Sequence, residues 1–274
     1  MEIVSDAYRS SRLGAFVVVS GLAFSSAARA ADGWGSAGDA DEPPPAAQAP
    51  APAPTSSRAG DAHTDRVILM PTAETQPQGT FFVSSYELVL LQFGYGITDD
   101  LQFSALILPP IVADQPFFIS PTLKLNVARG EAGNVALLGG VDVVVAGDDD
   151  DAAGMLGRFG AVGQICIQRG CRSSLSFNAL LWSGLAGAEG SVMLTSAGGV
   201  FRVTDTIALL LEPTFAIPLN GDLSEDDPVG AISYGMRFSG ASFGIDLSFV
   251  RPLTDITVEF ALGLPFVVAT CRTN

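Results

Sequence analysis

Apolar and polar residues alternate along much of the chain from Arg66 to the C-terminus. The clearest case is residues 79–110, GTFFVSSYELVLLQFGYGITDDLQFSALILPP, in which two apolar runs flank a polar turn at residues 98–100. After the turn, every second residue is apolar: Leu101, Phe103, Ala105 and Ile107. A period of two residues is typical of a β-strand with one apolar and one polar face. We therefore predict a β-hairpin whose arms have about the 9–11 residues that a tilted strand needs to cross a bilayer.

The same alternation predicts further strands along the rest of the chain. The regular ones are 116–128, 173–182, 230–238, 242–250 and 256–264. Less regular strands are expected at 134–146, 158–168, 190–202 and 206–217. Residues 80–97 carry no turn signal and are expected to form one long or bulged strand, and residues 66–72 supply one more. The total is about 12 antiparallel strands.

The composition of the polar faces decides between a soluble sandwich and a membrane barrel. A sandwich would expose many charged side chains there, whereas these faces are mostly Gly, Ser, Thr and Asn, and Lys124 is the only lysine. The mean hydropathy of +0.37, with 48% hydrophobic and 16% charged residues, agrees with a lipid-facing exterior. We predict an all-β fold, an antiparallel transmembrane β-barrel of about 10–12 strands over residues 65–274, with its polar faces toward the lumen.

The connections between the predicted strands alternate in length. Short turns are expected near 98–100, 130–133, 169–170, 203–205 and 239–241. The segments between them are mostly longer: 111–115, 147–157, 183–189, 218–228 and 251–255. Outer-membrane barrels have short periplasmic turns and long outer loops, so both ends of the barrel are expected on the periplasmic side.

The first 64 residues have a different character. Two arginines precede the apolar stretch 13–24, and small residues at 28–30 form a cleavage site, so residues 1–30 are predicted to be a secretory signal peptide. A membrane-anchoring helix is the alternative, but the apolar stretch is shorter than the roughly 20 residues that such a helix needs. Residues 31–64 are rich in Pro and Ala and are predicted to be a disordered periplasmic tether. The expected location is the outer membrane of a Gram-negative bacterium, with outer-membrane lipid and lipopolysaccharide as partners.

Charged residues on the polar faces are candidates for lining the lumen. They are Lys124, Asp142, Arg158, Glu212, Arg237, Asp246 and Glu259. Arg237 and Asp246 would face each other across the turn at 239–241. Lys124 and Asp142 are placed similarly about another turn. Opposite charges at such positions should pair, because a partly desolvated lone charge is costly. With no long loop expected to plug the barrel, we predict an ion-paired, near-neutral lumen that conducts weakly.

Candidate chemistry is sparse in this sequence. The only histidine, His63, falls in the predicted tether, and outer-membrane hydrolases generally pair a serine with a histidine base. We therefore predict that the chain is not an enzyme. No phosphate-binding Gly-rich loop and no HExxH zinc motif occur, so no cofactor is predicted. The net charge of −15 disfavours nucleic acid as a partner.

Three cysteines occur in the predicted barrel. Cys166 and Cys171 flank a predicted periplasmic turn, and the oxidising compartment favours a disulfide between them over two free thiols. A disulfide that closes so short a loop would mainly fix the turn, because its effect on stability grows with loop length. Cys271 is left over near the end of the chain.

Two acidic clusters fall on the predicted outer loops. They are Asp148, Asp149, Asp150 and Asp151, and Asp222, Glu225, Asp226 and Asp227. Clustered carboxylates can bind Ca²⁺ or Mg²⁺ through their oxygen atoms, and such an ion could bridge to lipopolysaccharide phosphates. The spacing fits no EF-hand, and a solvated, mutually repelling loop is the favoured interpretation, so no metal site is predicted.

The turn within residues 94–105, GYGITDDLQFSA, has a Tyr-Gly-apolar-Thr-Asp core. It resembles the turn of an uncharacterised family of Gram-negative outer-membrane barrels that includes phenol-degradation-pathway transporter-type barrels. The resemblance implies an outer-membrane barrel and, for function, the passage of small, apolar solutes. The leading expectation is a passive channel or transporter for small solutes. A non-conducting structural or surface-interaction barrel is the alternative, because both would show the same lumen and lipid-facing patterns.

Overall fold

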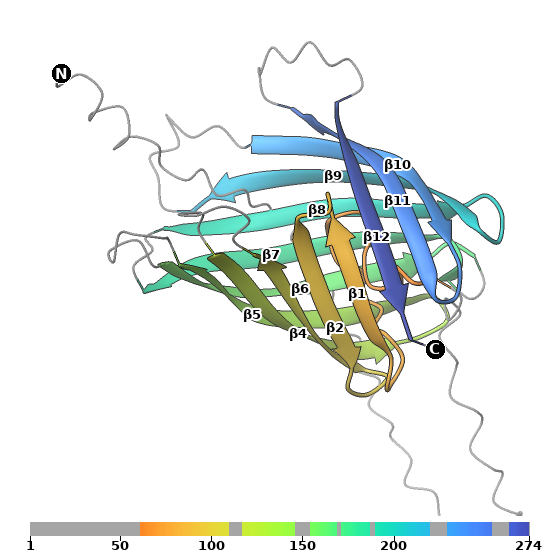
Figure 1. The fold of residues 1–274 in the computed structure, drawn as a ribbon, viewed down its shortest axis with the longest axis horizontal. Coiled ribbons are helices and arrows are strands. Elements are labelled where there is room, and N and C mark those ends of the chain that lie inside the picture. Colours follow the sequence, from red (N-terminus) through yellow and green to blue (C-terminus); the bar gives the residue numbers. More distant parts are fainter. Residues whose placement is uncertain are drawn as a thin grey trace, which may run out of the picture.

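The structure, a computed structural model, describes residues 61–109, 117–145, 154–168, 171–186, 190–219, 229–253 and 263–273. The described residues form a closed antiparallel barrel of 12 strands (Figure 1). In chain order the strands are β1 (Phe81–Tyr86), β2 (Leu90–Gly96), β3 (Leu101–Leu108), β4 (Phe117–Arg129), β5 (Gly133–Val145), β6 (Gly154–Cys166), β7 (Ser174–Ala186), β8 (Ser191–Arg202), β9 (Ile207–Pro218), β10 (Val229–Ser239), β11 (Phe243–Pro252) and β12 (Leu264–Arg272). Each strand pairs with its neighbours in the chain, and β12 pairs with β1, which closes the barrel.

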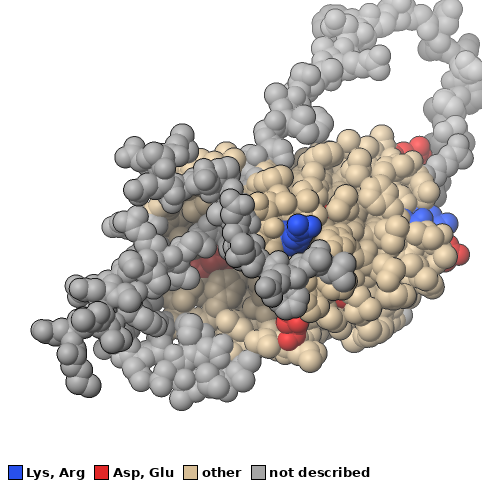
Figure 2. Space-filling view, turned by 90° about the horizontal axis from the view of Figure 1, so that it is seen from above, with Lys and Arg blue, Asp and Glu red and all other residues tan. Residues whose placement is uncertain are grey.

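The outward face of the strands is mostly apolar, and the buried polar side chains of the strands face inward, together with some apolar ones. On β4, Leu123 and Leu125 are exposed, whereas Lys124 and Asn126 are buried. On the face drawn in Figure 2, charged side chains of the described residues are few and scattered. Among the described residues, no helix is long and apolar enough to span a membrane. The predicted fold class is confirmed: the chain is an antiparallel transmembrane β-barrel, whose apolar exterior suits lipid.

The connections fall into two sets at opposite ends of the barrel. One end, here called the turn end, holds the connections 97–100, 130–132, 203–206 and 240–242, and the one between β6 and β7. The opposite end, here called the loop end, holds the connections that follow β1, β3, β5, β7, β9 and β11. The start of β1 and the end of β12 both lie at the turn end, as the alternation of connection lengths predicted.

The segment 80–97, predicted as a single strand, is two strands joined by a tight turn. Glu87 and Leu88 adopt positive φ angles of 53° and 63°, and the amide of Val89 donates to the carbonyl of Tyr86 (3.1 Å). Positive φ is uncommon for residues other than glycine, and Glu and Leu give no turn signal in a sequence. The prediction of one strand was therefore wrong.

Residues 66–72, also predicted as a strand, lie inside the barrel instead of in its wall. Within this segment an isolated bridge joins Arg66 to Pro71. The lost strand and the divided one cancel, so the predicted count of 12 is right although its composition was wrong. The final strand is displaced as well: β12 covers residues 264–272, and residues 256–262 lie outside the described residues.

Substitution of arginine for an outward-facing residue of β4 tests whether this strand is exposed to lipid. Leu123 is the middle residue of this strand, and Val127 lies nearer the turn end. Arginine costs about 2–4 kcal/mol at the midplane of a membrane barrel and about 0–1 kcal/mol near an interface. We expect Leu123→Arg to lower the free energy of unfolding by about 2–4 kcal/mol, and Val127→Arg by clearly less. Urea unfolding in lipid vesicles measures both, and equal costs would argue against a spanning β4.

Candidate functional site

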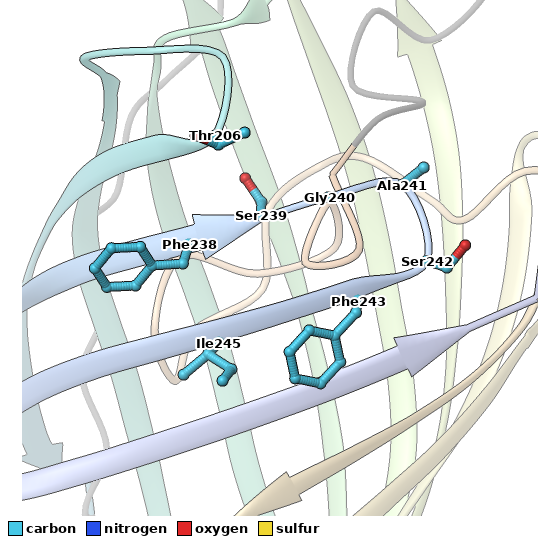
Figure 3. A pocket seen from close by; sticks show the side chains of 8 residues that line it. All are labelled: Thr206, Phe238, Ser239, Gly240, Ala241, Ser242, Phe243 and Ile245. Carbon is cyan, nitrogen blue, oxygen red and sulfur yellow. The ribbon is translucent and has the colours of Figure 1, made fainter.

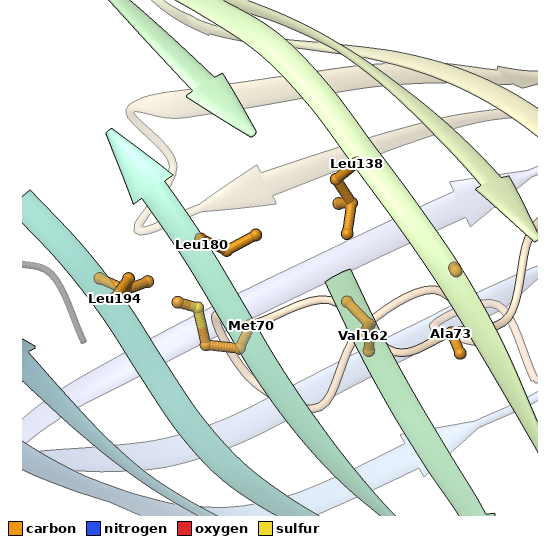
Figure 4. Close-up of a cluster of buried hydrophobic side chains, with 7 residues drawn as sticks. Met70, Ala73, Leu138, Val162, Leu180 and Leu194 are labelled. Atoms are coloured by element: carbon orange, nitrogen blue, oxygen red, sulfur yellow. The ribbon is translucent and has the colours of Figure 1, made fainter. Parts of the chain in front are cut away.

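Residues 61–79, here called the plug segment, occupy the lumen of the barrel. His63, Val67 and Ile68 are almost completely buried, although they belong to no strand. Figure 4 shows Met70 and Ala73 of this segment beside apolar side chains that project from the barrel wall: Leu138, Val162, Leu180 and Leu194. The prediction that nothing plugs the barrel was wrong, because the plugging segment precedes the first strand and is not one of the loops between strands.

The plug segment enters and leaves the lumen at the turn end. At its start, Asp61 lies 2.8 Å from the guanidinium of Arg202, the last residue of β8. At its end, the amide of Gln78 donates to Asp99 in a turn-end connection (2.9 Å). The backbone amide of Gly79 donates a hydrogen bond to the carbonyl of Gly96, the last residue of β2 (2.8 Å). The segment is therefore a loop inserted from the turn end, with its tip toward the middle of the barrel.

The tip of the plug segment is held by Glu212 of β9. The Glu212 carboxylate is fully buried and accepts hydrogen bonds from the backbone amides of Ile68 (2.8 Å), Leu69 (3.1 Å) and Met70 (3.2 Å). Val67 and Ile68 also pack on apolar wall residues: Val200, Ala208 and Leu210. A buried carboxylate needs such donors, because without them its desolvation would be uncompensated.

Arg237 of β10 connects the barrel wall to the plug segment. Its guanidinium binds Asp246 of β11 through two nitrogen atoms, at 2.7 Å and 2.8 Å. The same group donates to the backbone carbonyls of His63 (3.1 Å) and Arg66 (3.2 Å), and also to that of Val67. The charge of Arg237 is therefore paired with a carboxylate of the barrel wall, and its remaining hydrogen bonds go to backbone carbonyls of the plug segment.

His63 lies in the lumen and not in a tether. Its Nδ1 atom is 2.8 Å from Asp246, and its Nε2 atom has no hydrogen-bond partner among the described residues. Gly244 leaves the space that the imidazole needs, because a Cβ atom there would stand 3.2 Å from Nε2. Burial lowers the pKa of His63, although the neighbouring Asp246 acts to raise it. The predicted boundary between tether and barrel at residue 64 therefore falls inside the plug segment.

Lys124 of β4 binds the plug segment rather than Asp142. Its ammonium donates to the backbone carbonyls of Glu74 (2.6 Å), Asp65 (3.2 Å) and Thr72 (3.3 Å). Burial acts to raise the pKa of Asp65, but the charges of Arg66 and Lys124 outweigh it, and that pKa lies below its ordinary value. The expected pair of Lys124 with Asp142 does not form, because the plug segment lies within reach of the lysine.

The other predicted lumen residues lie at two levels. Glu212, Arg237 and Asp246 contact the plug segment together with Lys124. Asp142 and Arg158 face the lumen nearer the loop end, 3.5 Å apart. Glu259 and the two acidic clusters lie outside the described residues, as the possible divalent-cation site does. Within the described part of the chain, no three His, Cys, Asp or Glu side chains gather as a metal site would require.

Sequence reasoning missed the plug-segment side chains that complete this network. They are Asp61, His63, Asp65, Arg66 and Glu74. The run DAHTDR at residues 61–66 carries four titratable residues, and it was predicted to be the end of the disordered tether and the start of a strand at 66–72. A density of charge next to a region with few charged residues was the available signal.

Two further features lie at the turn end. A disulfide joins Cys166 and Cys171, whose Cα atoms are 4.5 Å apart, and Cys271 carries an exposed free thiol. A pocket of about 490 Å³ lies beside the 240–242 connection. It is lined in part by the outward-facing Phe238 and Phe243 (Figure 3). Because these phenyl groups point away from the lumen, the pocket is not part of the plugged site.

Neither a protein-family model nor a curated protein sequence matches this chain. The resemblance to transporter-type barrels therefore receives no support from these comparisons. Among solved structures that match is LpxR from Salmonella typhimurium, with 11% identity and a TM-score of 0.40. The match covers 71% of this chain and 99% of that chain. A likeness this distant carries no inference about what the chain does.

The prediction that the chain is not an enzyme is contradicted. It rested on the absence of a histidine from the barrel, whereas His63 lies in the lumen against Asp246. The argument against catalysis from an absent histidine therefore does not hold. Among the described residues, no hydroxyl or thiol donates to the free Nε2 atom of His63.

Replacement of Arg237 by alanine tests the link between wall and plug segment. The change leaves Asp246 and three plug carbonyls without their donor. Removal of one partner from a buried ion pair typically costs about 3–5 kcal/mol. We expect Arg237→Ala to lower the free energy of unfolding by that amount, measured by urea titration in lipid vesicles. Arg251→Ala, at an exposed site on β11, is the matched control and should change it by less than about 0.5 kcal/mol. Similar small changes in both variants would show that the network contributes little.

Proposed function

We propose that this protein is an outer-membrane channel for small solutes that is closed by its own plug segment. In this proposal a signal peptide at residues 1–30 directs the chain across the inner membrane and is removed. The following residues, up to the plug segment, remain in the periplasm. The turn end of the barrel faces the periplasm, and outer-membrane lipid and lipopolysaccharide surround the outside. Solutes pass through the lumen when the plug segment moves.

The observation that carries the proposal is that the closing element is separate from the wall. The 12 strands form the ladder with one another, and the Gly79–Gly96 bond at the end of β2 is the one described backbone–backbone hydrogen bond between a strand and the plug segment. Withdrawal of residues 61–78 would therefore leave the barrel ladder intact. A barrel of this size stands between the 8-strand barrels that side chains fill and the 16-strand porins that hold an aqueous channel. Without residues 61–79, its lumen would not be filled by the wall alone.

The contacts of the plug segment are compatible with reversible displacement. They are hydrogen bonds, ion pairs and apolar contacts, and none of those described is covalent. When the plug segment leaves, water that enters the lumen would form hydrogen bonds with the polar groups it uncovers. Each broken hydrogen bond would therefore cost only the net contribution typical of proteins, about 0.5–1.5 kcal/mol. A non-conducting structural barrel is the rival, because the same contacts would also serve to fill and stiffen the lumen permanently.

An engineered disulfide between the plug segment and the barrel wall distinguishes a gated channel from a non-conducting structural barrel. A Cβ atom at Gly198 would stand 3.2 Å from the Cβ atom of Val67, close to the roughly 3.5–4.5 Å separation found in disulfides. The test protein carries Val67→Cys and Gly198→Cys in a Cys271→Ser background, which removes the free thiol. Swelling of proteoliposomes in small sugars, amino acids and short alcohols measures passage before and after reduction.

For a channel gated by the plug segment, we expect no passage in the oxidised protein and passage after reduction. The Cys271→Ser protein, treated identically, controls for reduction of Cys166–Cys171 and should pass solutes in both states. Equal passage through locked and unlocked protein would show that the plug segment does not gate the barrel. The absence of passage for every solute in both states would favour the structural barrel.

A further inference from the structure

The lumen has a different character between the tip of the plug segment and the loop end. Inward-facing positions there are mainly apolar and include Leu108, Phe118, Val144, Leu156, Val192 and Val250. All six of these side chains are half-buried, although they lie inside a closed barrel. A side chain that faces the lumen and keeps part of its surface accessible borders open space and not packed atoms.

The tip of the plug segment forms the floor of this space. Leu69 is 45% exposed, whereas its neighbours Ile68 and Met70 are 0% and 8% exposed. Because the Leu69 amide is bound to Glu212 in the middle of β9, the side chain lies in the interior of the barrel. Leu180 and Leu194 pack around Met70 at the same level (Figure 4). The floor is therefore apolar, like most of the wall above it.

A small polar cluster interrupts these apolar walls. Arg158 donates to Ser120 (2.8 Å) and to Thr122, lies 3.5 Å from Asp142, and stacks 5.9 Å from the ring centre of Trp182. Asp142 and Arg158 are the only charged residues among the described inward-facing positions of this half. Their charges cancel, so the space has no net charge to attract or repel an ion.

Two atoms beside Arg158 lack hydrogen bonds. The Oδ1 atom of Asp142, an acceptor 3.5 Å from the Arg158 guanidinium, and the indole Nε1 atom of Trp182, a donor, make no hydrogen bond among the described residues. Asp142 is only 5% exposed. Buried polar atoms are nearly always satisfied, and each unsatisfied one costs about 1–3 kcal/mol. A bound group that both donates and accepts would satisfy them.

We propose that the loop-end half of the lumen binds a small neutral molecule with an apolar body and one hydroxyl group. The apolar body contacts the leucine, valine and phenylalanine side chains and Leu69 of the floor. The hydroxyl group lies at the Arg158 cluster, where it can donate to Asp142 or accept from Trp182. An anion is disfavoured because Asp142 already neutralises Arg158, and a hydrocarbon leaves both polar atoms unsatisfied. This proposal rests on the proposed function, since the site would lie on the path of the solute.

Trp182 provides a direct probe of binding, because the chain has two tryptophans and the other is Trp34. The test protein carries Trp34→Phe in lipid nanodiscs. The probes are 6-bromohexan-1-ol, 1-bromohexane and 6-bromohexanoate, whose bromine quenches nearby indole fluorescence. We expect saturable quenching by the alcohol, with an affinity at least about tenfold higher than that of the carboxylate or the bromoalkane, which corresponds to about 1.4 kcal/mol.

The variant Asp142→Asn sharpens the test by removing the charge that neutralises Arg158. In this variant, we expect the affinity for 6-bromohexanoate to rise at least about tenfold relative to the alcohol. Asp205→Asn, at an exposed turn-end position 88% accessible to solvent, is the matched control and should leave the order of the probes unchanged. Equal affinity for all three probes, tighter binding of the carboxylate to the unmodified protein, or quenching that never saturates would overturn the proposal.

The same titration with the plug segment locked separates this site from the channel function. The site lies on the loop-end side of the tip, so oxidised Val67→Cys/Gly198→Cys protein should bind the alcohol as the unlocked protein does. If binding persists but no solute ever passes, the channel function fails and the site stands. If solutes pass but the alcohol does not bind, the site fails and the channel function stands.

Discussion

The pairing of buried charges in the lumen is the constraint on which the rest of this structure depends. Five cationic side chains, Arg66, Lys124, Arg202, Arg237 and Arg272, and five anionic ones, Asp61, Asp65, Glu74, Glu212 and Asp246, lie buried or nearly buried in the turn-end half. The barrel wall supplies some of both signs but cannot satisfy them alone. Backbone amides and carbonyls of the plug segment complete the set at Glu212, Arg237 and Lys124. Wall and plug segment therefore depend on each other.

This dependence gives the lumen two parts with different properties. The turn-end half is polar, filled and closed, whereas the loop-end half has apolar walls and one neutral ion pair. A solute that arrives from the loop end would meet an apolar space before it meets the plug segment. Selection and closure would then be performed by different residues, so that changes at the Arg158 cluster and changes at Arg237 should have separable effects.

The alternation of residues was sufficient to predict the barrel and most of its wall, because lipid and lumen impose opposite demands on neighbouring positions. Six of the seven predicted lumen charges face inward, and the seventh, Glu259, lies outside the described residues. The turn at Glu87 and Leu88 was not predictable, since neither residue favours positive φ. β12 was misplaced because its sequence, LPFVVATCR, alternates poorly and carries Arg272 inward at its end. The plug segment was missed because its structure is set by contacts with the wall, and a sequence pattern reports only local preference.

Hydrogen exchange of the unmodified protein in lipid nanodiscs tests most directly whether residues 61–79 move independently of the barrel. The amides of Ile68, Leu69 and Met70 are bound to Glu212 and should be protected. If the plug segment opens while the strands stay paired, these amides will exchange well before the ladder amides of β4 to β9. If they exchange only together with the ladder amides, the plug segment is a fixed part of the folded barrel, and closure by a movable segment is contradicted.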